Sequence, residues 1–362
     1  MTDTLAPNTH SSFRIFLSDV LNRAVNAPSG DNSQPWRFSF DKNTVTLLNL
    51  ADADATLYNF RQRGSYFAHG AVIENISILA SEQGYRIEVA MFPDVPDATA
   101  RISFIPETPR AMPLARAIGQ RATNRKPYQR VPLQAEHRHA LLDAIADRDG
   151  VALRFVEGED ALASLARTVS VNERLLMENR TLHDFLFGMI RWSRDEERAA
   201  PGLYLKTMEL PPPVQLLFRF VLRHWTAVRL LNFIGLSRFI PIQSAQTYRA
   251  SSAFGAIVLA NDTDSDFISA GRAFERVWLT ATALGMSVQP VTAIPYLAQR
   301  VSAGEASVFS QTHQEMIRRA NSALSEAFGL QGGEHIAMLF RIGYGDTPSA
   351  TSTKMSPVIL ES

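Results

Sequence analysis

The chain contains 362 residues, of which 36 are basic and 36 acidic, so its formal net charge is zero. That length is enough for two average domains or one large one, and the balanced charge argues against nucleic-acid binding through bulk positive charge. The absence of cysteine excludes disulfides, thiolate metal sites and cysteine nucleophiles, and it fits the reducing cytoplasm. No stretch is long and apolar enough to span a membrane. None of the eight histidines has a convincing metal partner, so no metal site is expected.

The first predicted elements are a helix and a strand, joined by a loop rich in turn-forming residues. Residues 1–12 are expected to form a loose tail. Apolar residues then recur at helical spacing, at Leu17, Val20, Leu21, Ala24 and Val25. The segment APSGDNSQPWRF (27–38) follows, and Trp36, Phe38 and Phe40 alternate as in a strand. The short polar side chains and backbone N–H groups of this loop suit a flat polar ligand, and a purely structural turn is the alternative.

Two segments at a constant offset along the chain resemble each other. Gly70, Glu74, Ala80 and Gly84 match Gly271, Glu275, Ala281 and Gly285. In both copies apolar residues recur at helical spacing, and the helix is expected to end at the last glycine. Each copy follows a strand-like run into acidic turn residues and precedes two further strand-like segments. The sequence therefore predicts two related units in tandem, a first half over 13–110 and a second half over 111–362.

A cluster of basic residues lies near the junction of the two halves. Its members are Arg121, Arg125, Lys126 and Arg130. In an extended segment, Arg121, Thr123 and Arg125 would point to the same side. Two guanidinium groups with a hydroxyl between them suit a phosphate group. A solvated basic linker is the alternative interpretation.

The loop and the basic segment together resemble motifs of the FMN-dependent nitroreductase superfamily. APSGDNSQPW (27–36) looks like the family's loop against the flavin ring, and RATNRKPY (121–128) looks like its phosphate-binding segment. In that family the two motifs come from different subunits of an intertwined dimer. Here each occurs once, which resembles the fused, single-chain twins of the Acg type. The resemblance implies an α+β fold, a nitroreductase-like three-layer α-β-α sandwich, tandem duplicated as a pseudo-dimer in one chain that needs no further oligomer.

The resemblance also implies which residues hold FMN. Those expected at the phosphate are Arg121, Thr123, Arg125, Ser352 and Lys354. The residues expected to contact the flavin ring, or to brace the 27–38 loop beside it, are Pro28, Ser29, Gly30, Asn32, Pro290, Val291 and Thr292. A backbone N–H near Thr292 would face the flavin N5 atom, and no side chain is assigned as catalytic. Arg249 is expected either to reach the cofactor or to form a surface ion pair.

The second half carries an extra, lid-like helical segment at about 170–250. Wound as one helix, residues 214–235 are cationic on one face and apolar over the rest. Three interpretations remain open for this helix. It packs on the core, it covers the flavin, or it lies on an anionic membrane surface. The expected location is cytoplasmic, and membrane-peripheral under the third interpretation.

The chemistry implied by the resemblance is that of an FMN oxidoreductase. NAD(P)H would reduce the flavin, and a small quinone, nitroaromatic or similar conjugated acceptor would reoxidise it in a second half-reaction. The alternative is an FMN-binding, storage or sensor protein whose site is covered by the extra segment and which turns over little.

Overall fold

The computed structural model describes the backbone of residues 7–361 and the side chains of residues 13–360. The helices of the first half are α1 (Pro7–Ala24), α2 (Arg63–Glu82) and α3 (Ala115–Gln120). The strands of the first half are β1 (Trp36–Asp41), β2 (Thr44–Asn49), β3 (Tyr85–Met91) and β4 (Ala98–Pro106). The expected tail over 1–12 is corrected in part, because α1 already begins at Pro7, while residues 1–6 lie outside the described residues.

The second half contains the larger number of helices. Its strands are β5 (Val151–Val156), β6 (Ile190–Arg191), β7 (Leu203–Tyr204), β8 (Ala253–Leu259), β9 (Ser287–Pro290), β10 (His335–Gly343) and β11 (Ile359–Glu361). Its helices up to the insertion's end are α4 (Ala135–Asp143), α5 (Glu159–Val169), α6 (Val171–Glu178), α7 (Arg180–Met189), α8 (Arg194–Ala199), α9 (Pro212–Leu217), α10 (Trp225–Phe233) and α11 (Leu236–Arg249). The later helices are α12 (Asp264–Ala283), α13 (Ala293–Ser302) and α14 (Gln311–Ala327).

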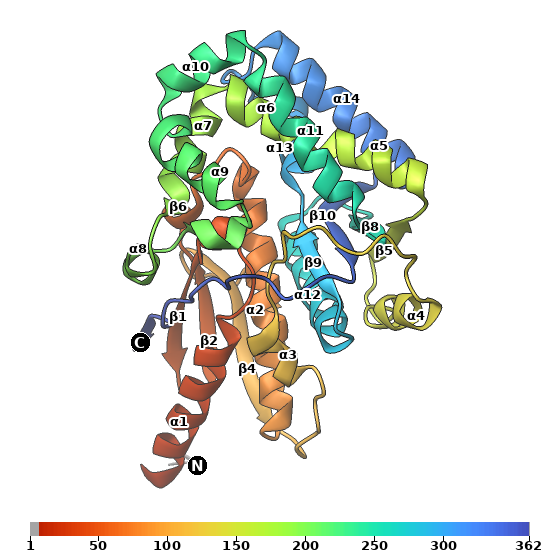
Figure 1. Ribbon diagram of the computed structural model, residues 1–362. Helices are drawn as coiled ribbons and strands as arrows, with labels where there is room; N and C mark the ends of the chain where they lie inside the picture. The colour runs from red at the N-terminus through yellow and green to blue at the C-terminus, as the bar shows by residue number, and fades with distance from the viewer. Residues whose placement is uncertain (1–6, 362) are drawn as a thin grey trace.

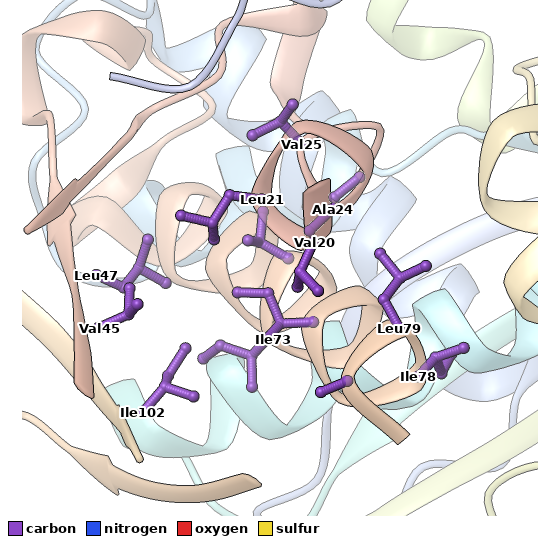
Figure 2. Close-up of a cluster of buried hydrophobic side chains, with 14 of the residues drawn as sticks. Val20, Leu21, Ala24, Val25, Val45, Leu47, Ile73, Ile78, Leu79 and Ile102 are labelled. Carbon is purple, nitrogen blue, oxygen red and sulfur yellow. The ribbon is translucent and has the colours of Figure 1, made fainter. Parts of the chain in front are cut away.

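The strands form two main sheets, with α2 and α12 packed against each other between them (Figure 1). The first sheet has the order β11-β1-β2-β4-β3 and the second the order β5-β8-β10-β9. The predicted alternation in β1 is confirmed, since Trp36, Phe38 and Phe40 are all buried. Figure 2 shows side chains of α1, α2, β2 and β4 converging in the core of the first half.

The second sheet is covered on both faces. Every residue of β8 is buried, as expected for a strand between two layers. Ala253 and Ile257 pack with α12, whereas Phe254 and Ala256 pack with α5, α13 and α14. This gives three α-β-α layers in the second half, and the mixed helix and sheet content confirms the α+β class.

Helices α2 and α12 touch at the two glycines that the sequence comparison matched. A Cβ atom on Gly70 would lie 2.0 Å from the carbonyl oxygen of Ile268, and one on Gly271 would lie 1.9 Å from that of Phe67. Phe67 and Ile268 are themselves matched positions, so each helix presents the equivalent carbonyl to the other's glycine. This reciprocal contact supports the predicted duplication.

The matched glutamates are both fully buried near this helix pair. Glu74 of α2 accepts from Arg148, Arg272 and Arg276, all in the second half. Burial alone would raise the pKa of Glu74, but the three arginine charges together hold it below its ordinary value. Glu275 of α12 instead faces Arg121, 3.5 Å away, and burial raises its pKa to about 7. The two halves are therefore joined by buried charges as well as by backbone contact.

Two segments assigned by sequence to the second half pack on the first. Helix α3 contributes Ala115, Ala117 and Ile118 to the first core. Strand β11 pairs in parallel with β1, with Phe38 opposite Ile359. The boundary at residue 110 is thus corrected, because α3 buries its apolar face in the core of the first half and β11 covers the open edge of β1. The C-terminal segment crosses the 27–38 loop on its way to β1.

The insertion is not built as expected, since residues 214–235 do not form one continuous helix. Helix α9 leads into a π-helical turn (Phe218–Leu222), and the extended backbone of His224 separates that turn from α10. The break frees the Leu222 carbonyl, which accepts from Nε2 of the buried His183 at 2.7 Å. It also brings Leu222 and Val228 into one small core with Met177 of α6. None of the helices in the described part of the chain is long and apolar enough to cross a bilayer.

Candidate functional site

The 27–38 loop is built around unusual backbone geometry. Asp31, Asn32 and Gln34 all have positive φ angles, which non-glycine residues rarely adopt. The backbone amide of Gln34 donates to Ser29 Oγ at 3.0 Å and holds the loop. Gly30 lies so close to Asp54 that a Cβ atom there would be 2.9 Å from Asp54 Oδ2, so the position favours glycine. Such clustered outliers are typical of loops shaped for a ligand.

A cavity of about 320 Å³ opens beside this loop. The loop forms one wall with Pro28, Ser29 and Gly30, and residues 290–293 form another. Aromatic and aliphatic side chains of the helices complete the lining, namely Phe67, Phe274, Trp278, Tyr296, Leu176, Phe185 and Leu186. A largely apolar cavity of this size with a few polar groups is typical of a cofactor or small-molecule site.

A second, polar cavity of about 180 Å³ adjoins the first. Its cationic lining residues are Arg121, Arg125 and Lys354, and its hydroxyls include those of Ser29, Thr123 and Ser352. Both cavities are lined by Pro28, Ser29, Asp31, Thr123 and Arg125, so they share one wall. We call the first the apolar slot and the second the cationic recess.

The predicted extended segment places its side chains as expected. Thr123 forms a parallel bridge to Val288 near the start of β9, and the Asn124 amide donates to the Val288 carbonyl at 3.0 Å. Arg125 donates to the Thr207 carbonyl at 3.0 Å. Arg121 stacks over Trp278, 4.4 Å from the ring centroid, and donates to the Asn26 carbonyl. Arg121, Thr123 and Arg125 therefore meet at the cationic recess, with Arg121 the more firmly engaged by protein.

The C-terminal segment closes the recess from the other side. Lys354 Nζ lies 2.7 Å from Asn32 Oδ1 and 2.9 Å from the Ala27 carbonyl. Asn32 donates in turn to the Thr353 carbonyl, so it braces the loop against this segment. Burial, with the nearby charge of Arg121, lowers the pKa of Lys354 to about 7. Buried cations this close together favour a bound anion, so the recess fits a phosphate group.

The far wall of the apolar slot carries the start of helix α13. Thr292 precedes the helix, and Thr292 and Ala293 both line the slot. The first amides of a helix have no carbonyl partner within it and point along the axis. Backbone donors are thus available at the predicted position near Thr292.

One predicted site residue lies elsewhere. Arg249 pairs with Glu159 at the surface and lines neither cavity. This corrects the expectation that Arg249 reaches the cofactor, and it matches the surface ion pair that the sequence left open. The preceding side chain in the helix, Tyr248, points into the slot instead.

Several acidic residues at the slot were missed from the sequence. Burial raises the pKa of Asp31 against the opposing charge of Arg125, and it raises the pKa of Asp54 to about 6. Glu173 of the insertion also lines the slot, accepts from Tyr248 at 2.6 Å and has a pKa raised by burial. Asp31 belongs to the turn residues of the loop, but its partners lie 23 or more residues away, and no local pattern indicates them.

The insertion covers the slot, but not through residues 214–235. Side chains from α6, α7 and α11 line it, among them Leu176, Phe185 and Tyr248. Helices α9 and α10 contribute no lining residue, and α10 packs on α6, α7 and α11. The segment over 170–250 therefore has an inner layer against the slot and an outer layer that includes α10.

Comparison with known proteins gives relatives along most of the chain. No family profile matches the chain. A protein of Mycobacterium tuberculosis named "Uncharacterized protein" is 25% identical over 342 residues, which are 92% of this chain but only 46% of that relative. Another from that organism, named "Putative NAD(P)H nitroreductase", is 27% identical over 312 residues, 84% of each chain. A Serratia protein named "Probable NAD(P)H nitroreductase PigM" is 24% identical over 303 residues, 79% of this chain and 82% of that one.

Solved structures of nitroreductases superpose only loosely on this chain. One from Desulfitobacterium hafniense with bound FMN gives a TM-score of 0.37 at 10% identity, covering 68% of this chain and 96% of that one. The FMN-dependent nitroreductase NfnB of Mycobacterium smegmatis, in complex with NADPH, gives 0.34 at 13% identity, covering 65% and 88%. The resemblance of this chain to nitroreductases is confirmed by its sequence relatives.

Proposed function

We propose that the protein is an FMN-dependent oxidoreductase that takes electrons from NAD(P)H and passes them to a small conjugated acceptor such as a quinone or nitroaromatic compound. The observation that carries the proposal is the apolar slot joined to the cationic recess through a shared wall. A flavin mononucleotide has the same two parts, a flat ring system and a phosphate. The names of the sequence relatives support the same class of activity.

The residues of this chain divide between the two parts of the cofactor. Arg121, Arg125 and Lys354 would hold the phosphate by charge-assisted hydrogen bonds. The 28–30 loop and residues 290–293 would hold the ring system between two walls. When bound, FMN would supply the hydride and electron transfer, and the protein would bind, orient and exclude water.

The lining of the slot indicates the kind of acceptor. Leu176, Phe185 and Tyr248 present mostly apolar surface, so a flat, conjugated compound would be favoured over a charged one. Such a surface discriminates weakly between ligands of similar shape, because few protein groups form hydrogen bonds with the polar groups of the ligand. We therefore expect several acceptors to react.

The direct test is an anaerobic titration of the purified, FMN-loaded protein with NADH and then NADPH, followed in the visible flavin band. We expect one of the two to bleach the flavin within seconds to minutes, and a quinone or nitroaromatic compound to restore the colour. Colour that neither nucleotide bleaches would support the alternative, a flavin-binding protein with a covered site. The relatives that carry a functional name are named as nitroreductases, which does not favour that alternative. Protein that takes up no FMN would refute both.

The affinity for FMN is expected to fall as pH rises through 7 to 9. Lys354 has a pKa of about 7 in the protein without ligand, and a bound phosphate would raise that pKa. Binding above pH 7 therefore takes up a proton, and the affinity decreases by up to about tenfold per pH unit. The second ionisation of the phosphate, with a pKa of about 6, lies below this window. Fluorescence titration of the protein with FMN measures the effect.

Two substitutions distinguish the contribution of Lys354 to this pH dependence from that of other titrating groups. Lys354→Arg keeps a charge at every pH in the window, so its FMN affinity should be nearly flat between pH 7 and 9. Lys354→Met should bind FMN more weakly at pH 7 and should also be flat. An unchanged slope in both variants would mean that Lys354 does not contact the phosphate.

A further inference from the structure

The outer layer of the insertion exposes large apolar side chains to solvent. Phe233 and Ile234, at the end of α10, are 84% and 82% exposed, and Leu230 is 69% exposed. Others on α9, α11 and the intervening turn are more than a third exposed, namely Leu216, Leu217, Phe220, Phe239 and Ile242. Single exposed apolar residues are common on proteins, but a run of eight on three consecutive helices is not.

The same helices carry exposed positive charge without acidic neighbours in sequence. Arg219, Arg223, Arg229 and Arg238 are all exposed. Arg223 donates to His224 and Arg219 lies over the Phe220 ring, and none of the four pairs with a carboxylate within the described residues. Residues 210–261 contain no aspartate or glutamate. We call these four arginines and the eight apolar residues the outer patch.

We propose that the outer patch docks on an anionic lipid bilayer. Apolar side chains at this spacing would enter the boundary between headgroups and acyl chains, while the arginines would reach the lipid phosphates. Each arginine near such a surface contributes about a fivefold gain in binding. The proposal does not depend on the flavin site, because no outer-patch residue lines either cavity.

A second copy of the chain fits the outer patch less well. Two copies meeting through this face would bring arginines against arginines, and the acid-free segment offers no carboxylate to offset them. An anionic surface would be attracted by the same charges. In Figure 1 α10 lies at the outer edge of the insertion, and α11 packs along α5 and α6 with Phe239 and Ile242 exposed, so both helices can contact a flat surface.

Contact of the outer patch with a bilayer would also bring lipid-soluble acceptors near the slot, if the protein has the proposed function. Helix α11 contributes Tyr248 to the slot and Phe239 and Ile242 to the outer patch. The insertion therefore lies between the slot and the proposed bilayer. Acceptors dissolved in that bilayer would be held close to the slot.

The test is co-sedimentation of the full-length protein with vesicles of phosphatidylcholine alone or with one third phosphatidylglycerol, at low and high salt. We expect at least tenfold tighter binding to the anionic vesicles at low salt and a marked loss at high salt. Phe233→Ser with Ile234→Ser should weaken binding about tenfold or more. Arg229→Glu with Arg238→Glu should abolish the preference for anionic vesicles.

Ile15→Ser is the matched control, since Ile15 is 70% exposed on α1, far along the chain from the outer patch. It should bind vesicles as the unchanged protein does. Sedimentation velocity of the same samples without lipid reports self-association. Equal binding to both vesicle types, no binding, or concentration-dependent dimerisation lost in the Phe233/Ile234 variant would each overturn the proposal. Flavin content and reducibility, measured on the same samples, test the proposed function separately.

Discussion

Replacing Gly271 by alanine should destabilise the protein by at least about 3 kcal/mol, because the new methyl group has no space between α12 and α2. Its carbon would lie 1.9 Å from the Phe67 carbonyl oxygen and close to the backbone of Gly70. Backbone of a buried helix cannot move aside as a flexible side chain can, so the two helices must separate. We expect the melting temperature to fall by at least about 5 °C. Thermal denaturation followed by circular dichroism measures the change.

Gly70→Ala should have a similar effect, because its methyl group would meet the Ile268 carbonyl at 2.0 Å. Gly188→Ala is the matched control. Gly188 also lies within a helix, but a Cβ atom there meets nothing within 4 Å. Its replacement should leave stability unchanged or raise it by up to about 1 kcal/mol, since alanine favours the helix. If Gly271→Ala melted like Gly188→Ala, the close contact between α2 and α12 would be wrong.

Separation of α2 and α12 should also change the shape of the apolar slot, since Phe67 of α2 and Phe274 of α12 both line it. A folded Gly271→Ala protein is therefore expected to hold flavin less tightly. The helix pair links the two predicted halves to one cavity, which neither half could form alone.

Local patterns in the sequence predicted the two central helices and most strands of the two main sheets. The matched helices lie within α2 and α12, and the flanking strand-like runs form β2, β3, β4, β8, β9 and β10. These elements have strong periodicity and glycines at their ends, and such signals are read from neighbouring residues. The turn chemistry of residues 28–32 likewise located the loop that lines both cavities.

Contacts between distant segments could not be predicted in this way. The pairing of β11 with β1 depends on an open strand edge, which no local composition reveals. At the break near His224, the freed Leu222 carbonyl accepts a hydrogen bond from His183, which lies 39 residues earlier in the sequence. Amphipathic spacing alone favoured an unbroken helix there, and the tertiary contact prevailed.

The same limit explains which cavity-lining residues the sequence indicated. Arg121, Thr123 and Arg125 line one recess because their alternation is local and the strand-like backbone preserves it. Asp54 and Glu173 were missed because their surroundings are assembled by the fold, and burial raises their pKa values only there. Arg249, for which the sequence left two roles open, forms the surface ion pair with Glu159.

Replacing Arg125 by alanine should weaken FMN binding by about 10- to 100-fold, the contribution of one charge-assisted hydrogen bond to phosphate. Arg125 lines both cavities, and among the described residues its guanidinium has one hydrogen bond, to the Thr207 carbonyl, so its other donors are available to a ligand. Removing Arg121 as well should leave a nearly colourless protein after purification. Because that change leaves the buried Glu275 without its partner, Glu275→Gln should accompany it to preserve the fold.

Riboflavin, which lacks the phosphate, distinguishes a phosphate contact from general damage to the site. Arg125→Ala should bind riboflavin as the unchanged protein does while losing affinity for FMN, measured by quenching of flavin fluorescence. Arg249→Ala is the matched control, because Arg249 is a nearby arginine that pairs with Glu159 outside both cavities. Equal losses for riboflavin and FMN would place Arg125 against the ring or in the framework of the site. Undiminished FMN binding in the Arg125 variant would mean that Arg125 does not contact the phosphate.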